Sequence, residues 1–234
     1  LSYGGESALH NINLKIKRGQ TVGIIGSTGS GKSSLVNLVP RFYDASSGEV
    51  LVDGADVKEY DATALRSKIG TVSQKKSLFE GSVRDNILIG KSDAADEEIW
   101  EALSTAQAKK MIEEKPGGLD FMLEQDGKNL SGGQRQRMTI ARALVRKPEI
   151  LILDDAASAL DYATGAALNA ALKSTDFAPT VITVSQRVSA IKNADLIIVL
   201  EDGKIAGTGT DAELLLNCTA YREICESQLE SEAI

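Results

Sequence analysis

The stretch GSTGSGKSS at residues 26–34 constrains the fold more than any other part of the chain. It fits the pattern G-x-x-x-x-G-K-[ST], with Gly26, Gly31, Lys32 and Ser33 in register. The apolar run TVGIIG precedes it, and SSLVNLVPRF follows with helical periodicity. These flanks predict a strand, a glycine-rich loop and a helix in succession, and they disfavour the alternative of a chance glycine-rich turn.

The loop has the residue types that hold phosphate groups. Glycines let successive backbone N–H groups converge on phosphate oxygens, and the following helix presents its positive end to them. Lys32 can neutralise the β and γ phosphates, and the Ser33 hydroxyl can ligate Mg²⁺. The expected phosphate contacts are Gly26, Ser27, Thr28, Gly29, Ser30, Gly31, Lys32, Ser33 and Ser34.

A second apolar run, ILIL, ends in the adjacent carboxylates Asp154 and Asp155. A buried strand that ends in two negative charges is costly unless a positive group, usually a metal ion, faces them. We expect Asp154 to hold the coordination shell of Mg²⁺, through water. An ordinary turn or cap is the alternative for a lone aspartate, and the phosphate loop in the same chain favours the metal.

The stretch LSGGQRQR at residues 130–137 opens an amphipathic helix. Ser131 can cap this helix, while Gly132 and Gly133 leave its first amides bare, which makes a second anion site. The two phosphate-binding ends lie about a hundred residues apart in the sequence. We expect them to lie in different lobes.

The remaining pattern predicts one α/β lobe with a helical insertion. Strands are expected at 48–54, where an Asp-Gly turn closes the strand, and at 69–74, 179–185 and 194–200, with a hairpin over Asp202 and Gly203. Amphipathic helices dominate from 82 to 147, and two more close the chain. The core lobe therefore comprises residues 1–81 and 148–234, and residues 82–147 form the helical lobe.

Composition limits which classes of partner and which cellular compartment we expect. The net charge of -7 disfavours nucleic acid and anionic membranes as partners. Cys218 and Cys225 are expected on one face of a C-terminal helix, packed and not disulfide-bonded. No stretch approaches the ~20 apolar residues of a membrane span, and no signal peptide is found, so we expect this piece to be soluble and cytosolic.

Together these motifs make the chain resemble the nucleotide-binding domain of an ABC transporter over nearly its whole length. The resemblance implies a P-loop NTPase (RecA-like) α/β core with an antiparallel β subdomain and an inserted helical subdomain, and it implies ATP and Mg²⁺ as cofactors. In that family two domains pair head to tail. The signature residues would then contact the γ-phosphate held by a partner: Ser131, Gly132, Gly133 and Gln134.

Other positions match the family one by one. Tyr3 resembles the aromatic residue that stacks on adenine, with a surface tyrosine of a strand as the alternative. Gln74 resembles the Q-loop glutamine, which touches Mg²⁺ and water and links to the membrane domain. SALD (158–161) resembles the D-loop, with Asp161 at the dimer seam. Without the resemblance, Gln74 reads as a polar residue at a strand end and Asp161 as a helix cap.

The stretch SLFEGSVRDNI at residues 77–87 is similar to exporter-type cassettes. It implies a half-transporter whose membrane helices precede residue 1, at the cytoplasmic face of the cell membrane. The chain also opens inside an expected strand, so we expect it to be a segment of a longer protein. The implied partners are a second cassette and the transmembrane domains of both halves.

The sequence departs from the family pattern at three positions. Asp155 stands where a glutamate usually polarises the attacking water; one methylene fewer retracts the carboxylate by about 1.5 Å, and a misplacement near 1 Å costs on the order of a hundredfold in rate. Gln186 stands where a histidine usually contacts the γ-phosphate, and the single histidine, His10, lies elsewhere. Gln125 occupies a usual glutamate position before the signature.

These departures favour a degenerate catalytic site. Lys32, Gln74, Asp155 and Gln186 would act on Mg·ATP slowly in this chain, while the intact signature completes the pocket of a different chain. A slow homodimer and a regulatory module without catalysis are the alternatives. A soluble cassette of DNA repair or translation would need coiled-coil insertions or tandem cassettes, and a GTPase would need an N-K-x-D motif.

Overall fold

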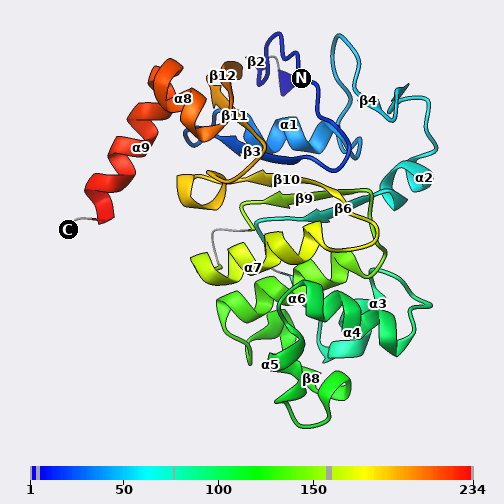
Figure 1. Cartoon of the computed structure of the whole chain (residues 1–234). Coiled ribbons are helices and arrows are strands. Elements are labelled where there is room, and N and C mark those ends of the chain that lie inside the picture. Colours follow the sequence, from blue (N-terminus) through cyan, green and yellow to red (C-terminus); the bar gives the residue numbers. More distant parts are fainter. Residues whose placement is uncertain (1, 4–5, 76, 157–159, 233–234) are drawn as a thin grey trace.

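A computed structural model gives the fold of the chain (Figure 1). It describes residues 2–3, 6–75, 77–156 and 160–232, and side chains over 8–75, 77–156 and 160–229. A six-stranded sheet in the order β12-β11-β3-β10-β9-β6 forms its centre, and only β12 runs antiparallel to its neighbour. Its strands are β3 (Thr21–Ile25), β6 (Ile69–Val72), β9 (Ile150–Asp154), β10 (Thr180–Val184), β11 (Leu196–Glu201) and β12 (Lys204–Gly209).

Both faces of this sheet are buried, which matches its nearly continuous aliphatic strands. Alternate residues of β9 serve different cores: Ile152 packs in the cluster that contains Val36 of α1 (Lys32–Leu38). Leu151 and Leu153 pack in the cluster of the helical lobe. Figure 1 shows α1 on one side of the sheet and α7 (Tyr162–Lys173), with the helical lobe, on the other.

The predicted helical lobe is present between β6 and β9. It holds α3 (Val83–Leu88), α4 (Asp96–Thr105), α5 (Lys109–Glu113), η1 (Gly118–Asp120), η2 (Gln125–Gly127) and α6 (Gly132–Leu144). It also holds a short ladder of β7 (Gly81–Ser82) with β8 (Met122–Leu123), which the sequence pattern did not predict. Helix α6 packs against α4 and β6, so the lobe and the sheet share one hydrophobic cluster.

Short antiparallel sheets lie on the α1 side. They are β1 (Ser2–Tyr3) with β2 (Glu6–Ser7), and β4 (Leu51–Val52) with β5 (Ala55–Asp56), followed by α2 (Ala62–Ser67). The strand expected at 48–54 is therefore only two residues long. Asp53 and Gly54 both have positive φ, and this tight turn ends β4. The hairpin predicted over Asp202 and Gly203 joins β11 to β12 by the same turn chemistry.

The C-terminal region contains the two expected helices, but the two cysteines do not lie on the same one. Helix α8 (Asp211–Asn217) ends at Cys218, whose backbone is extended, and α9 (Thr219–Glu232) begins after it. The shared-helix prediction was wrong because the chain turns at Cys218 to bury this side chain against β12. The packing prediction is confirmed: Cys218 is buried and both cysteines are free.

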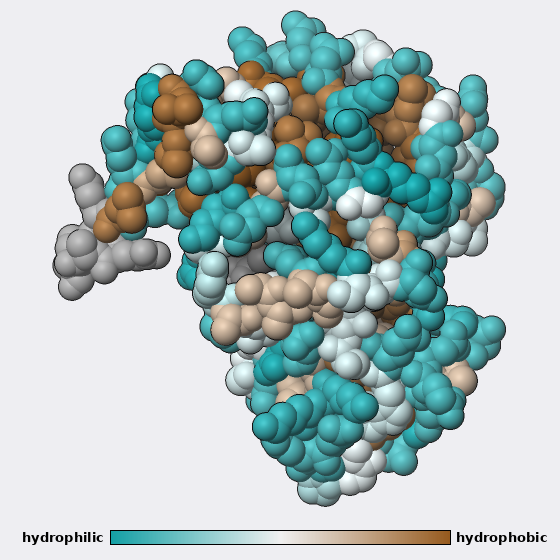
Figure 2. Space-filling model, viewed as in Figure 1, coloured by the Kyte–Doolittle hydropathy of each residue, from teal (hydrophilic) through white to brown (hydrophobic). Residues whose placement is uncertain are grey.

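The surface differs between the two ends of the molecule. Figure 2 shows hydrophobic side chains along α8 and α9, whereas the viewed face of the helical lobe is mostly hydrophilic. Leu216 and Leu229 are the most exposed apolar residues of these two helices among the described side chains. Within the described ranges, no helix combines the length and the apolarity needed to cross a bilayer.

Candidate functional site

Four of the predicted site segments follow four neighbouring parallel strands. β3 leads into Gly26, β10 precedes Gln186, β9 ends at Asp154, and β6 precedes Gln74. Val184 of β10 pairs with both its neighbours, opposite Asp154 in β9 and opposite a residue of β3. Open α/β sheets bind ligands outside the carboxyl ends of their strands, and the fold places these segments at that edge.

The phosphate loop wraps around the side chain of Lys32. The Lys32 ammonium donates to the carbonyl oxygens of Gly26 at 2.8 Å and Ser27 at 2.7 Å, and the residue is buried. Side chains would not fit at two glycines of this loop. A Cβ on Gly26 would lie 2.0 Å from the carbonyl oxygen of Leu200, and Gly31 combines a φ of 97° with a contact at 2.8 Å to Leu9.

Ser33 and Asp154, both expected to hold Mg²⁺, meet across the base of the loop. The Ser33 hydroxyl donates to Asp154 Oδ1 over 3.1 Å. A hydroxyl and a carboxylate are hard oxygen donors, and Mg²⁺ usually takes one or two protein oxygens while phosphates and water complete its shell. The described residues contain no cluster of three or more acidic, histidine or cysteine ligands. This pair therefore fits Mg²⁺ held jointly with a phosphate.

Burial acts on the two charges of the loop in opposite directions. It raises the pKa of Asp154, and the neighbouring Asp155 raises it further, while the hydrogen bond from Ser33 and the charge of Lys32 lower it. Burial lowers the pKa of Lys32, against the opposing effect of the two aspartates. Both charged forms are thus partly removed from water, a condition in which a bound ion or phosphate interacts strongly.

Asp155 lies beside Gln74 at the end of β9. Gln74 Nε2 donates to Asp155 Oδ2 over 3.2 Å. Asp155 has a φ of 51°, in the left-handed region that aspartate tolerates better than most residues, and its amide donates to the carbonyl of Val184. The structure therefore brings together Gln74 and Asp155, which lie 81 residues apart in the chain.

Gln186 follows the buried Ser185 and is exposed. The Ser185 amide donates to Ile24 in β3, which fixes the start of this loop next to the phosphate loop. The carbonyl of Gln186 accepts a hydrogen bond of 2.7 Å from Gln228 Nε2 in α9. Gln228 could not be found from the sequence, because a polar residue on an exposed helix gives no signal of a contact 42 residues away.

The signature forms the predicted capped helix start in the other lobe. Ser131 is the N-cap of α6: its hydroxyl accepts from the Gln134 amide at 3.2 Å, and Gln134 Oε1 accepts from the Ser131 amide at 2.9 Å. This reciprocal pair is a capping box. Since α1 and α6 lie on opposite sides of the sheet (Figure 1), the signature and the phosphate loop are at two separate helix starts of one chain.

The exporter-like stretch folds into a compact turn before α3. Asn86 is buried, and its side chain accepts from the amide and donates to the carbonyl of Phe79, both at 2.9 Å. Ser82 and Asp85 form the capping box of α3. The Phe79 side chain is left 57% exposed at this turn. Gln125, the third departure from the family pattern, is exposed in η2.

For the D-loop and Tyr3, the structure tests only the part of the prediction that concerns Asp161. Asp161 caps α7, accepting from the amide of Thr164 at 2.9 Å and from its hydroxyl at 2.8 Å, and these bonds lower the pKa of Asp161. The helix-cap interpretation is therefore confirmed, and its place at a dimer seam stays a prediction. Residues 157–159 and the Tyr3 side chain lie outside the described part, so the rest of the D-loop and the adenine contact also stay predictions. His10 is exposed.

Comparison with known proteins decides the family. Residues 9–158 match the family model described as ABC transporter. The chain belongs to the ABC transporter family. Its P-loop NTPase fold, with a mostly parallel central sheet and small antiparallel sheets, is the fold of that family. A solved structure of a bacterial Atm1-family ABC exporter with ATP bound superposes with a TM-score of 0.91 at 34% sequence identity.

Similar curated proteins also have names of ABC transporter or export ATP-binding proteins. An uncharacterized ABC transporter ATP-binding protein of Mycobacterium tuberculosis is 46% identical over 229 residues, 97% of this chain and 39% of that protein. A putative multidrug export ATP-binding/permease protein of Staphylococcus aureus is 44% identical over 220 residues, 94% of this chain and 38% of that protein. The structural match to the Atm1-family exporter covers 97% of this chain and 40% of that protein chain. It thus spans about two fifths of the relatives that it matches.

Proposed function

We propose that the chain is the ATP-binding and ATP-hydrolysing domain of an ABC exporter. The observation that carries this proposal is the Ser33 to Asp154 hydrogen bond beside a glycine-rich loop wrapped around Lys32. This arrangement offers backbone amides, one ammonium group and two oxygen donors to a triphosphate with its ion. The similarity to the Atm1-family exporter with ATP bound and to the Staphylococcus aureus multidrug export protein supports the exporter class.

Each site residue has a defined task in this reaction. The loop amides of 26–34 and the Lys32 ammonium bind the phosphates, and Ser33 with Asp154 would hold Mg²⁺. A bound Mg²⁺ would supply charge neutralisation on the phosphate oxygens. Gln74 and Asp155 orient the water that attacks the γ-phosphorus, and the bond to the β-phosphate oxygen breaks to give ADP and phosphate. Gln186 donates a hydrogen bond to the γ-phosphate from the adjacent strand end.

We infer further that this pocket is the slow one of an asymmetric pair. The Asp155 side chain is one methylene shorter than glutamate, so we expect its carboxylate, which also accepts from Gln74, to position the attacking water poorly. Gln186 has no cationic form and stabilises developing charge less than a histidine would. The signature with its capping box would complete the active site of a second, different cassette.

The implied partners follow from that pairing. A second nucleotide-binding domain would lie head to tail on this chain, and transmembrane domains of both halves would contact it at the cytoplasmic face of the cell membrane. Nucleic acid is not an expected partner, because the chain has a net charge of -7. A purely regulatory module would have no use for the ordered signature helix, which favours the catalytic pairing.

The proposal is tested by Mg·ATP binding and turnover of the 234-residue chain. We expect tight Mg·ATP binding with slow turnover, and we expect the double variant Asp155→Glu, Gln186→His to raise turnover at least about tenfold without changing affinity. Lys32→Ala is the control that loses binding. ATP-driven self-pairing with brisk hydrolysis by the unmodified chain would instead establish the homodimeric alternative, and no binding at all would reject the function.

A further inference from the structure

One side chain of the C-terminal helix holds the backbone of the loop that carries Gln186. Gln228 Nε2 donates to the carbonyl of Gln186 at 2.7 Å, and Gln228 Oε1 accepts from the amide of Val188 at 2.9 Å. A primary amide has one donor end and one acceptor end, and here both ends are used on the same turn. The two bonds fix the peptide units on either side of Arg187.

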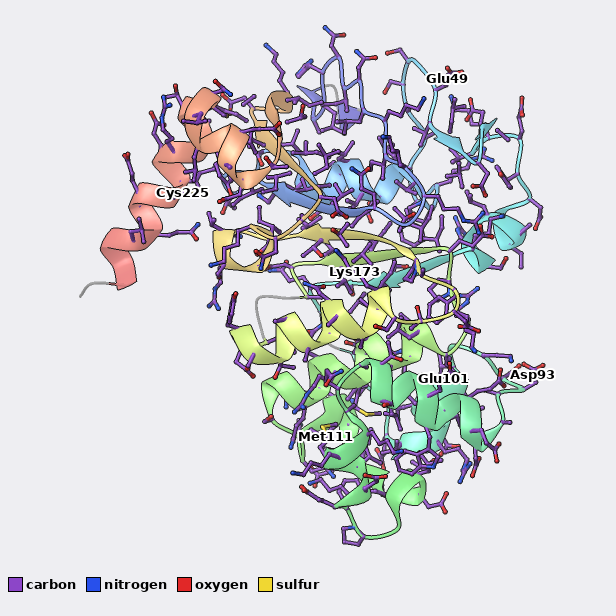
Figure 3. The ribbon with its side chains drawn as sticks, viewed as in Figure 1. Glu49, Asp93, Glu101, Met111, Lys173 and Cys225 are labelled. Carbon is purple, nitrogen blue, oxygen red and sulfur yellow. The ribbon has the colours of Figure 1, made fainter. Side chains whose placement is uncertain are left out.

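Helix α9 is itself anchored to the core on the side of this loop. Tyr221 is fully buried, and its hydroxyl donates to the Asp211 carboxylate of α8 at 2.6 Å. Ile224 and Cys225 pack with Val188 in the cluster that joins α9 to the sheet. Figure 3 shows Cys225 on α9, the helix that leads to the C-terminus. Gln228 lies about one turn beyond these contacts.

The same loop is held at its other end by α7. The Lys192 ammonium lies 5.3 Å from the ring centre of Tyr162, the first residue of α7 after the Asp161 cap. The Ser185 hydroxyl accepts from the amide of Arg187 at 2.9 Å. The loop is thus tied to β10, α7 and α9. The Ser185 hydroxyl and the Gln228 amide both bond the peptide unit between Gln186 and Arg187. Of these two groups, Gln228 comes from a separate helix and also bonds the next peptide unit, at Val188.

We propose that Gln228 is a positioning residue for Gln186. It holds the peptide unit of Gln186 so that this exposed side chain points to the γ-phosphate bound at the neighbouring strand ends. A nucleotide without a γ-phosphate makes no use of this contact, so Gln228 affects ATP binding and not ADP binding. This inference rests on the proposed function, because it presumes a triphosphate on the loop at 26–34.

The test compares Mg·ATP and Mg·ADP affinities by equilibrium titration of the 234-residue chain. Gln228→Met keeps the length of the side chain and removes both hydrogen bonds, while Gln228→Glu keeps the acceptor for Val188 and removes the donor to Gln186. Glu223→Ala changes an exposed residue of the same helix and is the matched control. Thermal unfolding of each variant reports whether α9 remains docked.

We expect Gln228→Met to weaken Mg·ATP about tenfold and to leave Mg·ADP unchanged, the loss of a net contribution of roughly one hydrogen bond. Gln186→Ala should cause a similar loss, and the double variant should lose no more than either single variant. Equal losses for both nucleotides, no loss for either, or additive losses in the double variant would overturn the inference. Failure of the unmodified chain to bind Mg·ATP would instead reject the proposed function itself.

Discussion

At the scale of single residues, the site is a set of charges partly removed from water before any ligand arrives. Lys32 and Ser33 were proposed as site residues from the phosphate-loop pattern, and Asp154 from an acidic strand end considered together with that loop; both patterns are local in the sequence. The Gln74 to Asp155 contact and the Gln228 bridge were not predictable in this way. Each depends on the order of strands or on helix docking, which bring distant segments together.

Asp154→Asn is expected to stabilise the nucleotide-free chain at neutral pH. Burial raises the folded-state pKa of Asp154, so the folded chain binds more protons than the unfolded chain between the two pKa values. Stability therefore falls as pH rises through that window, and the ionised carboxylate carries a cost above it. Asparagine removes this cost and keeps an oxygen for the Ser33 hydroxyl.

Thermal unfolding of both proteins across the acid and neutral range measures this effect. The gain of Asp154→Asn should disappear below the unfolded-state pKa of about 4. The same variant should lose the extra thermal protection that Mg²⁺ gives in the presence of ATP, because its metal-binding oxygen is no longer charged. A lower midpoint than that of the unmodified chain at neutral pH, without ligand, would contradict the burial argument.

At the scale of elements, helix ends and glycines set the local stability. Predicted helix boundaries were accurate where the sequence contains a recognisable capping residue, as at Ser131. They were inaccurate at Cys218, where tertiary packing ends α8. The strand expected at 48–54 was shortened by its own Asp-Gly turn. Sequence propensity and hydrophobic pattern predict element boundaries poorly where contacts with another element determine the local backbone conformation.

Gly165→Ala is expected to stabilise the chain. Gly165 lies in the first half of α7, its φ is not positive, and a Cβ there would meet no atom within 4 Å. Glycine in a helix interior costs about 0.5–1 kcal/mol relative to alanine. The midpoint of thermal unfolding should rise by roughly 1–4 °C. An unchanged or lower midpoint would show that the helix surface at Gly165 is not open as described.

Asp161→Ala is expected to destabilise α7 in a pH-dependent way. Hydrogen bonds from Thr164 lower the pKa of Asp161, so the ionised cap contributes stability above its unfolded-state pKa, and this contribution is lost as pH falls through the folded-state pKa. The difference in unfolding midpoint between Asp161→Ala and the unmodified chain should be largest near neutral pH and should narrow in acid. A difference in midpoint that does not change with pH would show that the charge of Asp161 does not contribute to the stability of α7.

At the scale of the whole molecule, one hydrophobic cluster runs from the sheet through the helical lobe. The α/β core and the inserted helices were predictable because hydrophobic periodicity changes from strand-like to helical near residue 82 and back near 148. The shared hydrophobic cluster was not predictable, because the sequence pattern does not show which faces of the helices and the sheet pack together. In the predicted pairing, a displacement of the signature helix would therefore be transmitted to β6 and the segment of Gln74.

In the proposed asymmetric pair, two unequal pockets would form from this chain and a different cassette, with catalysis in the pocket that this chain's signature completes. Single-turnover ATP hydrolysis by the assembled transporter tests it most directly. We expect Asp155→Asn to leave turnover nearly unchanged, and we expect loss of the partner's residue at the matching position to abolish it. Abolished turnover in Asp155→Asn, with turnover intact after the partner's change, would contradict the assignment, and equal losses would show two equivalent sites.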